Sequence, residues 1–231
     1  MLFDTATNNS ESAAPSFLWK GIFHAHTDAS PDCAMTTDTI IERCLDEGVD
    51  VYTVTDHGTL DGAHRLADRA PFRVIVGEEI QAVEGGDLIG LFLRRPVSPR
   101  LPARDVIRAI REQGGLVYIP HPFDTSRKKQ WPASVRAEVL NEADIVEVFN
   151  ARNVFSSADR QAAAFALAHG KTAVAGADAH RPSEIGRTLV YLPPFATATE
   201  LLESLERSEF RCVRTPRWRT LVPRLLSHLA S

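Results

Sequence analysis

Short apolar segments alternate with amphipathic segments along this chain, and that alternation is the feature that most limits its fold. The predicted strands are residues 18–23, 51–55, 73–77, 87–93, 116–120, 145–149 and 172–176. Short strands separated by helical segments indicate parallel pairing through right-handed crossovers. Seven such strands predict an α/β barrel, or a sheet close to closing.

Several of the intervening helices have recognisable ends. Thr36 or Thr37 is expected to cap a helix that ends at Gly48. Further helices are predicted at about 103–113, 157–169 and 197–207. Each carries apolar residues at helical spacing, which would pack against the strands.

The composition is that of one soluble globular domain. The 231 residues suffice for a single large core, and 44% of them are hydrophobic while 24% are charged. The formal net charge of −4 argues against an overall basic surface for nucleic acids, although a local groove could still hold phosphates.

Cysteine usage and the chain ends bear on location and domain organisation. Cys33, Cys44 and Cys212 lack CxxC spacing, so neither a disulfide framework nor a thiolate zinc site is indicated, and a cytoplasmic location is expected. The chain has no signal-peptide pattern and no long apolar run, so neither export nor a membrane span is expected. The predicted organisation is a disordered lead (1–17), a barrel domain (18–195) and a C-terminal helical extension packed on the barrel (196–231).

Side chains with metal-binding groups follow nearly every predicted strand. In chain order they are His24, His26, Asp56, His57, Glu78, Glu79, His121, Glu147, Asn150, Asp178 and His180. The carboxyl ends of parallel barrel strands open on one face, so these side chains are expected to converge there. Any one of them could be an ordinary loop or capping residue, but their common position after strands favours a shared site.

The chemistry of this set indicates a metal centre. Imidazole and carboxylate without thiolate suit Mn²⁺, Fe²⁺ or Zn²⁺. Roughly eight ligands exceed what one catalytic ion takes from protein, which predicts two or three divalent ions sharing carboxylates. Clustered ions of this kind hydrolyse phosphate esters with a metal-activated hydroxide.

The motifs HAHTDASPD, TDHGTLDG, GEE, PHP around His121, EVFN and GADAH together resemble the polymerase-and-histidinol-phosphatase (PHP) domain family, in particular its small stand-alone metal-dependent phosphoesterases. The match runs in order from about residue 19 to 190. It implies a distorted (β/α)7 barrel with a two- or three-metal site at the C-terminal rim of the strands.

The resemblance also implies roles for individual residues. The implied metal ligands are His24, His26, Asp32, His57, Glu79, His121, Asp178 and His180. Of these, Glu79 would bridge ions, and Asp178 and His180 would join it as catalytic residues. Asp56, Glu147 and Asn150 would support the ligands, and Glu78 is assigned no metal. Asp87 stands where many relatives carry histidine.

Positive charge for a substrate phosphate is expected from Arg152, Arg127 and Arg187, which lie just past the rim motifs. The alternative is that these are ordinary solvated arginines. Lys128 and Lys129 lie in a long loop that could cover the site. The basic segment 211–231 is expected to be a terminal helix packed on the barrel. Its alternative role is a docking arm for a partner subunit, an anionic lipid surface or nucleic acid.

The function predicted from these observations is that of a cytoplasmic metal-dependent hydrolase of phosphoric esters. Its substrate would be a nucleotide, an oligonucleotide end or a small phosphorylated metabolite. Two alternatives stay open: hydrolysis of an amide or lactone at a site of the same ligand type, and a non-catalytic binding module stabilised by metal.

Overall fold

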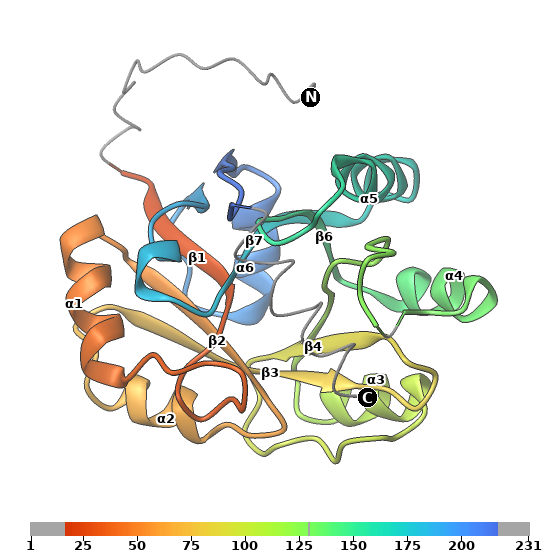
Figure 1. The fold of residues 1–231 in the computed structure, drawn as a ribbon, viewed down its shortest axis with the longest axis horizontal. Helices are drawn as coiled ribbons and strands as arrows, with labels where there is room; N and C mark the ends of the chain where they lie inside the picture. Colours follow the sequence, from red (N-terminus) through yellow and green to blue (C-terminus); the bar gives the residue numbers. More distant parts are fainter. Residues whose placement is uncertain (1–16, 129, 217–231) are drawn as a thin grey trace.

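The computed structural model describes residues 17–128 and 130–216. Seven strands form a closed barrel, because β1 pairs with both β2 and β7 (Figure 1). Their bounds are β1 Trp19–Ala25, β2 Val51–His57, β3 Arg73–Gln81, β4 Asp87–Leu91, β5 Leu116–Ile119, β6 Ile145–Asn150 and β7 Thr172–Ala179. Each overlaps one predicted strand, and the predicted distorted (β/α)7 barrel is confirmed.

The barrel departs from the expected parallel pairing at β4, which runs antiparallel to both β3 and β5. The reason is the connection: only residues 82–86 separate β3 from β4, which is too short for a crossover helix. Gln81 therefore pairs with Asp87 across the turn. Asp87, at the start of β4, consequently lies on the rim where the parallel strands end.

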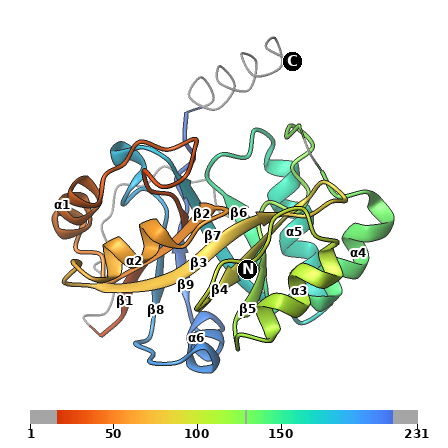
Figure 2. The same cartoon turned by 90° about the horizontal axis from the view of Figure 1, so that it is seen from below.

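Six α-helices and a short 3-10 turn are found in the described residues. Their bounds are α1 Thr37–Glu47, α2 Asp61–Ala67, α3 Ala103–Arg111, α4 Ala133–Glu142, α5 Ser156–Ala168, α6 Ala198–Leu205 and η1 Pro182–Glu184. The helices lie around the outside of the strands (Figure 2). Helices α1, α3, α5 and α6 match predicted segments, whereas α2 and α4 have no counterpart among the predictions.

The ends of α1 form as its sequence predicts. The side chain of Thr36 accepts a hydrogen bond from the backbone N–H of Thr39 (3.3 Å), which satisfies one of the free donors of the first turn. Gly48 ends the helix in the left-handed conformation (φ 63°), which glycine adopts without a steric penalty. Between these caps, Ile40 and Cys44 are buried against the barrel.

Two further strands extend the sheet outside the barrel. β8 (Leu189–Leu192) pairs antiparallel with β1, and β9 (Glu209–Arg211) pairs antiparallel with β8. Helix α6 connects them and buries Leu201 and Leu205. The predicted C-terminal extension is therefore described as far as residue 216. The terminal helix expected over 211–231 does not include residues 211–216, because Arg211 ends β9 and no helix follows as far as residue 216. Residues 217–231, and with them the rest of that helix or docking arm, lie outside the described residues, as do residues 1–16 of the predicted lead.

Apolar side chains from several strands fill the barrel interior beneath the rim. Ile75 lies four residues before Glu79 on β3 and so faces the same side of the sheet. It belongs to a buried cluster with Phe23, Ile89 and Tyr118. Polar residues at the strand ends therefore rest on a solid apolar core. Within the described ranges, no helix is both long and apolar enough to cross a lipid bilayer.

Candidate metal centre

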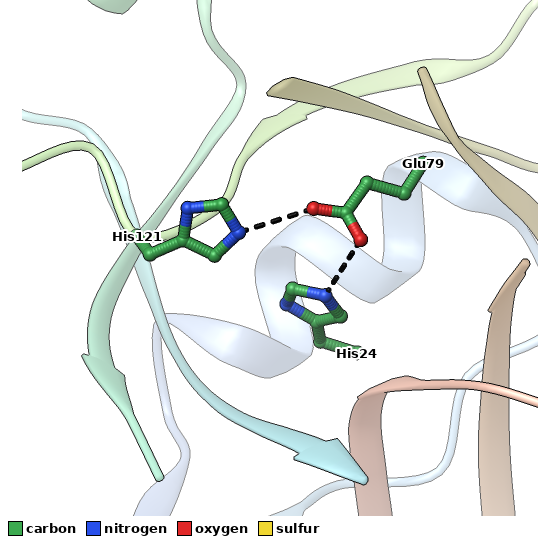
Figure 3. A group of neighbouring side chains, drawn as sticks. All are labelled: His24, Glu79 and His121. Atoms are coloured by element: carbon green, nitrogen blue, oxygen red, sulfur yellow. Dashed lines mark hydrogen bonds and ion pairs between the residues drawn. The ribbon is translucent and has the colours of Figure 1, made fainter. Parts of the chain in front are cut away.

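Glu79, near the end of β3, lies at the centre of the polar rim (Figure 3). Its Oε1 is 3.1 Å from Nε2 of His121, and its Oε2 is 3.2 Å from Nε2 of His24. The same Oε2 lies 3.5 Å from Nε2 of His26 and 3.7 Å from Nε2 of His57. One carboxylate thus faces four imidazoles from three other parts of the barrel.

Asp178, on β7, presents its two carboxylate oxygens to different partners. Oδ1 lies 3.8 Å from Nε2 of His24 and 3.9 Å from Nε2 of His26. Oδ2 accepts hydrogen bonds from Arg127 (2.7 Å) and from the side-chain amide of Asn150 (3.2 Å). One oxygen therefore faces the histidines while protein donors hold the other in place.

Asp32 and His180 form the outer edge of the site. Oδ2 of Asp32 is 2.9 Å from Nε2 of His180 and 3.6 Å from Nε2 of His57. The ring of His180 lies 4.2 Å, centroid to centroid, from that of His26. Asp32 is about half exposed, so this edge opens to solvent.

All eight predicted metal ligands are thereby brought together. Their donor atoms form four groups, each with every atom within 4.8 Å of the others. The groups are His24–Glu79–His121, His24–His26–Asp178, His26–His57–Glu79 and His26–Asp32–His180. Neighbouring groups share His24, His26 or Glu79, so the donors form one continuous cluster.

The backbone is strained at three of these residues. His24, His121 and Asp178 have positive φ values of 58°, 32° and 47°, in a region that residues with a Cβ rarely adopt. The pairing register of β1 also shifts around His24, between residues 22 and 25 against β2 and between residues 23 and 25 against β7. This bulge turns His24 toward Glu79, and its ring centroid lies 5.4 Å from that of His26.

The electrostatics of the cluster keep its carboxylates ionised. Burial opposes the charge on Glu79, but His24 and His57 hold the pKa of Glu79 well below its usual value. Burial would likewise lower the pKa of His24, but Glu79, Glu147 and Asp178 raise it well above normal. His26 differs, because burial and the nearby His180 hold its pKa well below normal.

Glu147, on β6, organises the residues behind the cluster. Its Oε1 accepts from Nδ1 of His24 (2.9 Å) and from the hydroxyl of Tyr118 (2.6 Å). Its Oε2 accepts from the backbone N–H of His121 (2.7 Å) and the amide of Asn150 (2.8 Å). Tyr118 was not predicted as a site residue; its position inside an apolar strand was the available signal, since a buried hydroxyl needs a partner.

Asp56 lies beside the cluster and makes hydrogen bonds to Thr27, not to an imidazole. Its two oxygens accept from the backbone N–H and the hydroxyl of Thr27, both at 2.6 Å. Helix α2 approaches so closely that a Cβ at Gly62 would lie 2.1 Å from Oδ2 of Asp56. Asp56 thus holds the segment that follows His26.

The three arginines expected near a substrate phosphate have different surroundings. Arg127 is paired with Asp178 and, at 3.3 Å, with Asp124. The charge of Arg152 helps to lower the pKa of Asp178, although burial, His24 and Arg127 act more strongly on that group. Arg187 donates to the backbone carbonyl of Arg214 (3.1 Å).

Two other carboxylates stand near the cluster without belonging to the four groups. Asp87 accepts from Gln81 (3.4 Å), and burial together with Glu79 raises its pKa. Glu78 turns away from the cluster and accepts from the backbone N–H of Val97 (2.8 Å).

The residues present fit divalent metal ions. Nε2 of His26 is fully buried and makes no hydrogen bond, although it faces Glu79 and Asp178. His24 uses Nδ1 for Glu147 and His180 uses Nδ1 for the carbonyl of Asp178, which leaves Nε2 of each toward the cluster. Imidazoles that bind metal are typically oriented in this way by a partner on the other nitrogen.

Comparisons with known proteins agree with this fold and site. A family model described as PHP-associated matches residues 157–210. The uncharacterized protein MJ0417 of Methanocaldococcus jannaschii is 30% identical over 171 residues, which are 72% of this chain and 68% of that protein.

Two solved structures share the fold. A two-domain protein from Bacteroides vulgatus containing a predicted PHP-like metal-dependent phosphoesterase gives a TM-score of 0.67 at 20% identity, over 90% of this chain and 69% of that one. Endonuclease Q, in complex with a 27-mer duplex with an abasic lesion at the active site, gives 0.62 at 14% identity, over 82% and 57%. From its motifs, barrel and relatives, this chain belongs to the PHP domain family.

Proposed function

We propose that this chain is a metal-dependent phosphoesterase. The observation that carries the proposal is the continuous cluster of buried histidines and carboxylates at the barrel rim, in which Glu79 faces four imidazoles. Burial of so many charged groups together costs folding free energy, so the cluster indicates a role other than stabilising the fold. The family assignment supports the same function.

The ions would be held by the eight clustered residues. His24, His26 and Asp178 form one set of donors, and His24, His121 and Glu79 form the next. A third set at the outer edge comprises His26, Asp32 and His180, and His57 joins His26 and Glu79 in a fourth. Two or three divalent ions, Mn²⁺, Fe²⁺ or Zn²⁺, match this mixture of nitrogen and oxygen donors. Glu79 would be the bridging carboxylate.

Bound ions would supply Lewis acidity, which lowers the pKa of water and neutralises charge on a transferring phosphoryl group. The protein's own part is to keep the donors in position. Glu147 fixes the orientation of the His24 ring, while Arg127 and Asn150 fix Asp178. His180 and Asp32, at the solvent-facing edge, would meet an entering substrate first.

The arginines would contribute charge at the substrate end of the site. Arg152 is the first candidate for a phosphate oxygen, because its charge already acts on Asp178. Arg127 would add positive potential while bound to Asp178. Arg187, which donates to Arg214, would act at a greater distance through its charge alone.

The substrate class that we propose is a nucleotide, an oligonucleotide end or a small phosphorylated metabolite. The likeness to endonuclease Q, whose structure contains duplex DNA, supports a nucleic-acid derivative at the level of fold. A metal-dependent hydrolysis of amides or lactones is the competing activity.

The first test measures inorganic phosphate and mononucleotides released by the Mn²⁺-loaded protein from mononucleotides, sugar phosphates and short oligonucleotides. Asp178→Ala should reduce release by about 100-fold or more, since it removes a carboxylate that faces two histidines. Asp68→Ala is the matched control and should keep wild-type activity, because Asp68 is an exposed aspartate at the C-terminal end of α2.

A protein that binds Mn²⁺ but releases nothing across this panel would contradict the proposal. Turnover of amides or lactones under the same conditions would then favour the competing hydrolase. Absence of turnover on both panels would favour a binding module.

A further inference from the structure

We propose that Arg214, in the segment that follows β9, is a positioning residue for the metal centre. It clamps the turn after β6, residues 150–153, which carries Asn150 and Arg152 to the rim. This inference rests on the proposed function of the site. The C-terminal segment 212–216 would then support the metal centre in addition to packing against the barrel.

The clamp is an ion pair between a partly exposed arginine and a buried aspartate, with several additional hydrogen bonds. Arg214 pairs through Nη2 with Oδ2 of Asp159, on the first turn of α5. Its Nη1 donates to the backbone carbonyls of Asn153 (3.0 Å) and, more weakly, Asn150 (3.5 Å). The guanidinium carbon lies 4.9 Å from the centroid of the Phe149 ring. One side chain therefore contacts both ends of the turn and the strand before it.

Asp159 holds the same turn from the other side. Its Oδ1 accepts from the backbone N–H of Asn150 (3.2 Å) and from the side-chain amide of Asn153 (2.7 Å). The side chain of Asp159 is nearly fully buried, and burial raises its pKa although Arg214 and Asn153 oppose that effect. Arg214 supplies the positive charge that this buried carboxylate needs.

The turn transmits this restraint to the cluster through Asn150. The amide of Asn150 donates to Oε2 of Glu147 (2.8 Å) and to Oδ2 of Asp178 (3.2 Å). The side-chain oxygen of Asn150, Oδ1, accepts from the backbone N–H of Arg152 (2.8 Å). A turn that relaxed would move the amide away from both carboxylates, and Arg152 with it.

The geometry calls for arginine. A planar guanidinium can reach a carboxylate and two carbonyls at once while lying over an aromatic ring, whereas the ammonium of lysine acts as a point charge. The segment itself is fastened to the turn, since Thr215 donates from its backbone N–H to the carbonyl of Ala151 (2.8 Å). Arg187 donates to the carbonyl of Arg214, which ties the loop before β8 to the same place.

The experiment compares Mn²⁺ affinity by titration calorimetry for the wild type, Arg214→Ala, Asn150→Ala and the double variant, starting from metal-stripped full-length protein. Arg214→Ala should weaken Mn²⁺ binding about tenfold, the scale on which residues that orient metal ligands act. Because Arg214 acts through Asn150, the double variant should bind no more weakly than Asn150→Ala alone. Phosphate release should fall in the same order.

Arg211→Ala is the matched control. Arg211 lies three residues earlier, on β9, and its guanidinium donates to the carbonyl of Gly186 rather than to the turn. Its removal should leave Mn²⁺ affinity within twofold of wild type. If Arg214→Ala fails to fold, Arg214→Lys and Asp159→Asn replace it, each with an expected loss of Mn²⁺ affinity of about threefold or more.

The inference is overturned if a folded Arg214 variant binds Mn²⁺ as wild type does, or if the losses from Arg214→Ala and Asn150→Ala are additive. Either result would leave Arg214 as a residue of fold stability alone. Failure of the proposed function is a separate result, because the wild-type protein itself would then bind no Mn²⁺ or release no phosphate.

Discussion

At the scale of single residues, the chain uses neighbouring carboxylates in opposite ways. Glu79 faces the histidines of the cluster, and they keep its pKa low. Glu78, one residue earlier, points to the other face of β3, where burial raises its pKa to about 7. Alternation along a strand is enough to separate the two environments. Two consecutive glutamates thus provide one acid that faces the histidine cluster and one acid buried on the opposite face of β3.

Glu78→Gln should therefore change the pH dependence of stability. Because folding raises the pKa of Glu78 to about 7, the folded state keeps its full stability below the ordinary pKa of glutamate, where the side chain is neutral. It loses part of that stability as the pH rises through about 7 and the buried side chain ionises. The variant should melt about 3 °C higher than wild type at pH 8 and close to wild type at pH 4. Thermal unfolding of the metal-stripped proteins at both pH values would measure this. An unchanged difference between the two pH values would contradict the assignment.

At the scale of elements, the contact between β6 and β7 determines where the supporting carboxylate can lie. Glu147 crosses over Gly176, and a Cβ at that glycine would lie 1.7 Å from Oε1 of Glu147. The register of the two strands also shifts between Glu147 and Phe149. The close approach leaves Glu147 room to reach His24, Tyr118 and Asn150 together.

Gly176→Ala should displace Glu147 and with it the ring of His24. We expect a loss of stability of about 2 kcal/mol or more, because a buried carboxylate loses hydrogen bonds and the strands must separate. Mn²⁺ affinity should fall about tenfold in parallel. Chemical denaturation and calorimetry would measure the two effects. A variant with wild-type stability would show that the strands accommodate the methyl group without moving Glu147.

At the scale of the whole molecule, the candidate ligands span the chain from His24 on β1 to His180 after β7. Ions bound among them would cross-link the first and last strands of the barrel, next to the point where β1 and β7 pair. Outside the barrel, β8 pairs with the first residues of β1, and Arg214 holds the turn that follows β6. Metal binding and closure of the barrel are therefore expected to be coupled.

Addition of Mn²⁺ should raise the melting temperature of the metal-stripped protein. A free concentration 100 times the dissociation constant stabilises the folded state by about 2.7 kcal/mol per site, or roughly 5–10 °C for a chain of this size. Differential scanning calorimetry with and without Mn²⁺ would measure the shift. Asp178→Ala should shift much less, and equal shifts in both proteins would place Mn²⁺ elsewhere on the surface.

The sequence by itself determined the seven barrel strands and the kinds of donor at the rim. Strand and helix periods are local properties, so segments such as 51–55 and the capped helix ending at Gly48 can be read from neighbouring residues alone. The same local patterns predicted that His24, Glu79 and His121 lie at strand ends. The family motifs predicted a distorted (β/α)7 barrel, which the pairing of β1 with both β2 and β7 confirms.

Only the tertiary structure decided how those donors face one another. The bulge and positive φ at His24, the antiparallel course of β4, and the pairing of Arg127 with Asp178 depend on contacts between segments far apart in sequence. The Arg214–Asp159 clamp is of the same kind, since it joins residues 55 positions apart. The periodicity of the sequence cannot predict such partners. Hydrogen bonds and ion pairs across a barrel depend on how the barrel closes and not on local propensity.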